Sequence, residues 1–141
     1  MQIGVATDEA VANHCVFIID SCEVNRAALQ CMLQDGYETH EWRAVELALE
    51  RIRSRRPQAV IIGQDAMGPD AAQTVDKIRG ASPDTRVLVV IGSPHGSQGP
   101  GHLASGAHGL ITQPLSIEAV RRTVRLALGL PVMIAIGVAP G

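Results

Sequence analysis

The chain has 141 residues, of which 46% are apolar, 18% charged and 2% aromatic, and its formal net charge is −2. This length fits one ordinary domain with a buried core. The small negative charge gives no attraction to nucleic acid or to an acidic membrane, and Phe17, Tyr37 and Trp42 are too few to form a base-stacking surface.

The first half of the chain is predicted to alternate between buried strands and amphipathic helices. Residues 1–14 have no clear period and are interpreted as a lead-in. Residues 15–19 (CVFII) are a continuous apolar run, typical of a strand buried on both faces of a parallel sheet. A helix over residues 23–34 and a more polar edge strand over residues 37–41 follow. The apolar positions of that helix, at helical spacing, are Val24, Ala27, Ala28, Met32 and Leu33.

The alternation continues to the end of the predicted domain. A helix is expected over residues 45–55 with apolar Leu47, Leu49 and Ile52, then a strand over 59–62 and a helix over 71–79 with Val75 and Ile78 inward. A strand over 86–91 precedes a loop over 92–101 (GSPHGSQGPG), which leaves room for at most a short helix around 102–105. A strand over 109–112 and a helix from the N-cap Ser116 to Leu128 complete the series; Asp70 is the candidate N-cap of the helix that begins at residue 71.

Five strand–helix alternations predict the fold class. They are typical of a doubly wound (βα)5 α/β domain with a five-stranded parallel sheet and helices on both faces. We expect this domain to span residues 15–128, with a shortened fourth helix. The apolar tail over 129–141 is expected to add a sixth strand or to cover an apolar patch.

Four stretches resemble the receiver domain of bacterial response regulators. They are IIDSCEVNR (18–26), RRPQAVIIG (55–63), RVLVVIG (86–92) and GAHGLITQPLS (106–116), and the last is the most specific. The resemblance covers residues 15–128. It implies a flavodoxin-like fold and a role in two-component signal transduction, where the phosphorelay passes a phosphoryl group to an aspartate beside Mg²⁺.

The resemblance also assigns the positions of that reactive site. Asp20 holds the first acidic position, whereas Ser21 replaces the second acid and Gly63 replaces the acceptor aspartate. The Thr or Ser position falls on Ile91 or Gly92, and the lysine position falls on Gln113. The switch aromatic is replaced by Leu110. Because Mg²⁺ needs carboxylate oxygens, its binding is expected to be weak or absent, and no other cofactor is implied.

These losses compensate one another in charge. Two carboxylates are missing, and so is the lysine that would balance them, so that Gln113 avoids a buried unpaired ammonium. Asp20 alone can be satisfied by backbone N–H groups and Ser21. We therefore expect a pseudo-receiver, a non-enzymatic module that acts by phosphorylation-independent protein–protein interaction.

Two alternatives stay open. Asp65 lies two residues after Gly63, and Asp65-Ala66-Met67-Gly68-Pro69 partly mimics the Asp-x-x-Met-Pro pattern of the family, so Asp65 is a candidate displaced acceptor; otherwise it is a solvated loop acid. The former phosphorylation cleft is also a candidate small-molecule site, since α/β folds bind ligands at the carboxyl ends of their strands.

The resemblance implies an interaction surface as well. Receivers commonly dimerise or dock partners through their fourth helix, fifth strand and fifth helix, which here corresponds to about residues 102–128. The expected partner is a second copy of the chain or another protein; the simpler interpretation is a solvated face. The candidate residues are His102, Leu110, Leu115, Val120, Arg121, Val124 and Arg125.

Cysteines and histidines predict no metal site. Cys15, Cys22 and Cys31 form no CxxC pair and are interpreted as reduced, small buried hydrophobes in a cytoplasmic protein. The five histidines have no i, i+4 pair and no cysteine at zinc-ligand spacing, so they are interpreted as surface residues. No signal peptide and no run long enough to span a membrane is visible in the sequence.

Overall fold

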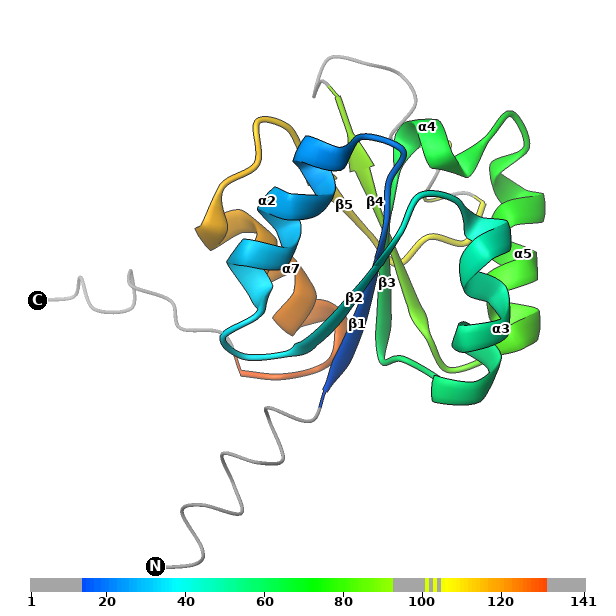
Figure 1. The fold of residues 1–141 in the computed structure, drawn as a ribbon, viewed down its shortest axis with the longest axis horizontal. Helices are drawn as coiled ribbons and strands as arrows, with labels where there is room; N and C mark the ends of the chain where they lie inside the picture. Colours follow the sequence, from blue (N-terminus) through cyan, green and yellow to red (C-terminus); the bar gives the residue numbers. More distant parts are fainter. Residues whose placement is uncertain (1–13, 93–100, 102, 104, 132–141) are drawn as a thin grey trace, which may run out of the picture.

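A computed structural model describes residues 14–92, 101, 103 and 105–131. Within these residues, five strands form one sheet in the order β2-β1-β3-β4-β5, and every neighbouring pair is parallel (Figure 1). The predicted five-stranded parallel α/β fold is confirmed. The strands are β1 (Cys15–Ile19), β2 (Glu38–Trp42), β3 (Ala59–Gly63), β4 (Arg86–Ile91) and β5 (Gly109–Thr112).

Helices cover both faces of the sheet. In Figure 1, α2 (Glu23–Leu33) and α7 (Ile117–Ala127) lie on one side, while α3 (Val45–Arg55) and α5 (Ala71–Ala81) lie on the other. Alternate side chains of β1 enter the two cores, so Phe17 belongs to the cluster under α3 and α5, and Ile18 belongs to the cluster under α2 and α7. This alternation explains why the central strands are apolar at every position.

The helix boundaries follow from local chemistry. The Ser116 hydroxyl accepts a hydrogen bond from the Ala119 N–H at 3.1 Å, and an Asp70 carboxylate oxygen accepts one from the Gln73 N–H at 3.0 Å, so both predicted N-caps are confirmed. At the C-terminal end of α3, Arg56 takes a left-handed conformation with φ 48°. The chain then turns into β3.

The inward faces of two helices match the prediction only in part: Leu33 of α2 and Ile52 of α3 are buried as expected, but other predicted positions are not. Val24 of α2 is 75% exposed and Leu47 of α3 is 54% exposed, whereas Leu29 and Ile52 are fully buried. The apolar residues of α2 and α3 fit more than one stripe of a 3.6-residue period, and contact with the sheet selects between the stripes. The buried positions are Leu29 and Leu33 of α2, and Val45, Ala48 and Ile52 of α3.

One short helix was not predicted. Residues expected to form a loop after β3 instead form α4 (Gln64–Met67), which buries Met67 and ends at Gly68 with φ 78°. A single turn is too short to show a helical period in the sequence. This turn is relevant to the site because it carries Gln64 and Asp65.

Several predicted segments lie wholly or mostly outside the described residues. These are the lead-in, the loop after β4 and the apolar tail; Gly101 and Leu103 are helical, but the shortened helix around residues 102–105 is not described as a whole. Cys15 is buried as expected, whereas Cys22 and Cys31 are exposed, which contradicts their interpretation as buried hydrophobes. Among the described residues, no helix is long and apolar enough to cross a membrane.

Candidate functional site

The carboxyl edge of the sheet brings together residues that are far apart in the sequence. Asp20 directly follows β1, Gly63 ends β3, Gly92 follows β4 and Gln113 follows β5. All four line one cleft of about 130 Å³. Ligand sites of open parallel sheets lie at this edge. Ile91 is buried, 6% exposed, in the core under α3 and α5, so Gly92 is the residue that occupies the cleft.

Asp20 is buried and held in place by its own loop. Its side chain is 3% exposed, and Oδ1 accepts a hydrogen bond from the Cys22 N–H at 2.8 Å. Asn25 Nδ2 lies 3.4 Å from Oδ2. The predicted backbone N–H donor is thus present, but Ser21, the other predicted partner, is exposed and Asn25 takes its place. Among the described residues, the Asp20 carboxylate is therefore satisfied by its own loop and α2 without an ion pair.

The backbone around Asp20 is fixed as well. Its N–H donates to the carbonyl oxygen of Trp42 at 3.1 Å, and its carbonyl oxygen accepts from Arg26 Nη1 at 2.8 Å. Arg26 in turn pairs with Glu41, with Nε 3.4 Å from Oε1. These contacts join the end of β1 to β2 and α2, and they leave Asp20 little freedom to move as a whole.

Gly63 lies directly against the carboxylate of Asp20. A Cβ atom built on Gly63 would lie 2.4 Å from Oδ2, 2.6 Å from Cγ and 3.0 Å from Oδ1 of Asp20. Cβ atoms essentially never approach other heavy atoms to less than 3.0 Å. The backbone itself does not require glycine here, because φ −69° and ψ 148° are ordinary extended angles. The space where a side chain at position 63 would begin is therefore occupied by Asp20.

Neutral amides complete the cleft. Gln113 Nε2 lies 3.4 Å from Asn25 Oδ1, so Asn25 links Gln113 to Asp20. Gln64 Oε1 accepts a hydrogen bond from the Gly92 N–H at 3.3 Å and so connects α4 to the end of β4. The Gln113–Pro114 peptide bond is cis. Asn25 and Gln64 were not predicted as site residues, although Asn25 lies within the stretch 18–26 and Gln64 directly follows the stretch 55–63, both of which carry the receiver resemblance.

The charge of the cleft is unfavourable for a phosphoryl group. Its described lining contains the carboxylates of Asp20 and Asp65 and no lysine or arginine. Asp65 is exposed on α4 at the rim. Mg²⁺ does not fit the receiver positions either, because Ser21 is exposed and neutral, Gly63 has no side chain and Asp20 is already hydrogen-bonded. The displaced-acceptor hypothesis for Asp65 stays a prediction.

The predicted interaction surface needs correction. Val120 and Val124 are fully buried against the sheet, so they stabilise the core and are not available to a partner. Leu110 and Leu115 are partly buried against the two opposite core clusters. His102 lies outside the described residues.

The remaining predicted surface residues, two arginines, contact the domain itself. Arg121 Nε donates to the Met32 carbonyl oxygen at 2.8 Å, and Arg125 Nε donates to the Pro131 carbonyl oxygen at 2.5 Å. Both are partly buried. The exposed apolar positions of α7 are Ile117 at 44% and Leu126 at 64%.

Comparison with known proteins supports the fold. No family model and no curated protein matches the sequence. Among solved structures, the receiver domain of NtrX from Brucella abortus has a TM-score of 0.73 and 22% identity, covering 82% of this chain and 99% of that one. The chemotaxis response regulator CheY4 of Vibrio cholerae has a TM-score of 0.70 and 21% identity, covering 81% and 98%.

A two-component response regulator from Clostridium difficile gives the same result, with a TM-score of 0.72, 20% identity and coverage of 83% and 97%. This chain therefore has the fold of response-regulator receiver domains over nearly the full length of those structures. At these identities the likeness concerns the fold.

Proposed function

We propose that this domain is a pseudo-receiver in two-component-type signalling, which binds a protein partner or a second copy of itself without being phosphorylated. It acts in the cytosol as a binding module and not as an enzyme. The observation that carries the proposal is the contact between Asp20 and Gly63. The acceptor position lacks a carboxylate, and the space above it is filled by the neighbouring acid.

The electrostatics of the cleft support the same conclusion. A phosphoryl group adds about 1.5 to 2 negative charges at neutral pH, and here it would lie near Asp20 and Asp65. The described lining supplies only neutral amides from Asn25, Gln64 and Gln113 in place of cations. Repulsion between like charges would therefore oppose phosphorylation at this edge.

The cleft alone is too small for a drug-sized ligand, but an adjoining pocket of about 760 Å³ shares Gln64 and Asp65 with it, so the small-molecule alternative stays open. Small-molecule pockets usually measure about 300–1,000 Å³, whereas this cleft measures about 130 Å³. A thermal-shift screen with nucleotides and metabolites tests this directly. A shift that is lost in a Gln113→Ala variant would favour the small-molecule alternative.

The phosphorylation experiment uses acetyl phosphate and Mg²⁺, followed by intact-mass measurement under conditions that preserve acyl phosphates. Wild type, Asp20→Asn and Asp65→Asn are treated side by side, with a phosphorylatable receiver as the positive control. We expect no stoichiometric mass gain in this chain. A stoichiometric gain on any aspartate would overturn the proposal, and a gain that disappears in Asp65→Asn would identify Asp65 as the acceptor.

The interaction experiment tests the exposed apolar positions of α7, Ile117 and Leu126. Leu126 is 64% exposed there, and Leu47 on α3, in the opposite helix layer, is 54% exposed and serves as a matched control. We expect sedimentation analysis to show an assembly that Leu126→Glu dissociates and Leu47→Glu leaves intact. If both variants behave as wild type, α7 is not the interface.

A further inference from the structure

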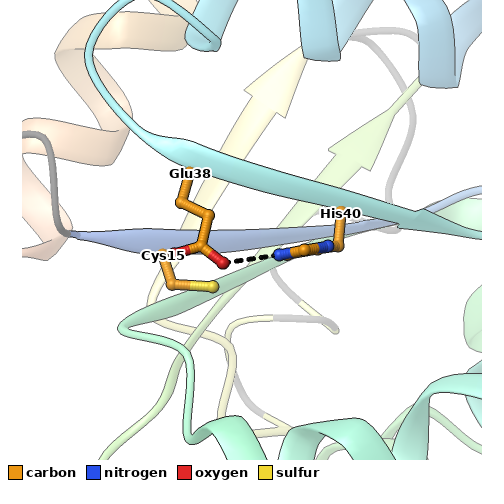
Figure 2. A group of neighbouring side chains, drawn as sticks. All are labelled: Cys15, Glu38 and His40. Carbon is orange, nitrogen blue, oxygen red and sulfur yellow. Dashed lines mark hydrogen bonds and ion pairs between the residues drawn. The ribbon is translucent and has the colours of Figure 1, made fainter.

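A second cluster of reactive side chains lies near the amino ends of β1 and β2, at the end of the sheet opposite to the cleft. Cys15 begins β1 and pairs in register with Glu38, the first residue of β2. Side chains of a strand alternate between its faces, so His40 shares the face of Glu38. Figure 2 shows the three side chains pointing toward one another, with Glu38 and His40 from β2 and Cys15 from β1.

The geometry of this cluster is close to that of a metal centre. One ligand atom each from Cys15, Glu38 and His40 lies within 4.8 Å of both others, and His40 Nε2 is 2.7 Å from Glu38 Oε2. In a tetrahedral zinc site, bonds of about 2.0–2.3 Å place the ligand atoms roughly 3.3–3.6 Å apart. Small side-chain rotations that separate His40 from Glu38 would therefore make room for an ion.

We propose that Cys15, Glu38 and His40 form a binding site for Zn²⁺ or a similar borderline divalent cation, with water as the fourth ligand. Thiolate, imidazole and carboxylate together match Zn²⁺, whereas Mg²⁺ and Ca²⁺ select oxygen ligands. The thiol of Cys15 loses its proton to solvent as the sulfur–metal bond forms. The site lies at the amino ends of the strands and does not depend on the proposed function of the cleft.

The surroundings of the cluster limit the motion of its ligands. Cys15 is 4% exposed, and the ring of His40 packs edge-on against Phe17, with ring centroids 5.6 Å apart. Trp42 flanks the same imidazole, with centroids 6.0 Å apart. Residues fixed in this way lose little conformational freedom when they bind an ion, which favours binding.

Arg55 at the end of α3 is the competitor for the ion. Its guanidinium pairs with Glu38, and the side chain is 38% exposed. An ion bound to the Glu38 carboxylate must displace this arginine, which can then turn toward water. A dication bound to one thiolate and one carboxylate is formally neutral, so Arg55 and the nearby Arg51 add little repulsion once the ion is in place. Arg55 should therefore weaken binding without preventing it.

The test is a Co²⁺ titration of the full chain, followed by competition with Zn²⁺. The background carries Cys22→Ser and Cys31→Ser, because both exposed thiols could bind metal nonspecifically. We expect a thiolate-to-cobalt charge-transfer band that Zn²⁺ abolishes. Cys15→Ser should remove this band, and His40→Gln should weaken binding by roughly tenfold or more.

Arg55→Gln provides a test in the opposite direction. Removing the competing guanidinium should tighten Zn²⁺ binding by roughly two- to fivefold, the effect of a partly exposed ion pair. Circular dichroism of each variant confirms folding. If no thiolate band appears in the folded background protein, or if Zn²⁺ binds Cys15→Ser as tightly as the background protein, the cluster is only a hydrogen-bonded ion pair and the proposal is wrong.

Discussion

Replacing Gly63 with alanine tests the contact between Gly63 and the Asp20 carboxylate, on which the proposed function depends. The new Cβ would lie 2.4 Å from Asp20 Oδ2, so the buried carboxylate must rotate away. Rotation breaks the 2.8 Å hydrogen bond from the Cys22 N–H to Oδ1, and a hydrogen bond to a charged group contributes about 1.5–3 kcal/mol. Alanine also restricts the unfolded chain, which stabilises the folded state by about 0.4–1 kcal/mol. The net expectation is a loss of about 1–2 kcal/mol.

Urea unfolding followed by circular dichroism measures this loss. With a slope of about 2 kcal/mol per molar urea, the midpoint should fall by roughly 0.5–1 M. Gly80→Ala is the matched control, because a Cβ at Gly80 meets nothing within 4 Å. That substitution, near the end of α5, should stabilise the protein by up to about 1 kcal/mol.

A double-mutant cycle separates the clash from other causes. Asp20→Ala removes the three atoms that the new Cβ would meet, so Gly63→Ala should become neutral or slightly stabilising in that background. The expected coupling energy is about 1–2 kcal/mol. An equal loss in both backgrounds, or no loss in wild type, would show that Asp20 does not occupy the space above Gly63.

Three other predictions follow from the same structure. Arg56→Gly should stabilise the protein by about 0.5–1 kcal/mol in urea unfolding, because Arg56 has φ 48°; a loss would show that the angle is not strained. Ser116→Ala should cost about 1 kcal/mol through loss of the N-cap hydrogen bond to the Ala119 N–H, and Ser116→Asp should retain the stability. Partial burial, then the charges of Arg86 and Arg79, lower the pKa of His108, so folding should weaken as pH falls below 6.5; His108→Gln should flatten that dependence.

The fold was predictable because its strands carry a strong local signal. The runs at residues 15–19 and 86–91 are apolar at nearly every position, and the structure places β1 and β4 at these bounds. The helix faces were harder to predict. Val24 and Leu47 are apolar but exposed, because contact with the sheet selects among possible stripes of one helix and the sequence of the helix alone does not contain that contact.

The two candidate sites differ in how much of each could be predicted from the sequence. The missing acceptor at Gly63 is visible by resemblance, whereas the approach of the Asp20 carboxylate to that glycine depends on side-chain positions. The cluster of Cys15, Glu38 and His40 was missed because its spacing follows from strand register. Cys15 is 23 residues from Glu38 in the sequence, and only the pairing of β1 with β2 makes them neighbours.

The packing of Asp20 on Gly63 also affects the order in which substitutions can accumulate. A carboxylate introduced at position 63 would meet Asp20 before it could meet any metal, so this change alone lowers stability and restores no chemistry. After substitution of Asp20 by a smaller residue, the same change at position 63 would no longer clash with a carboxylate. The effect of one mutation thus depends on whether the other came first. A carboxylate at position 63 therefore requires either a prior change at Asp20 or a loss of stability.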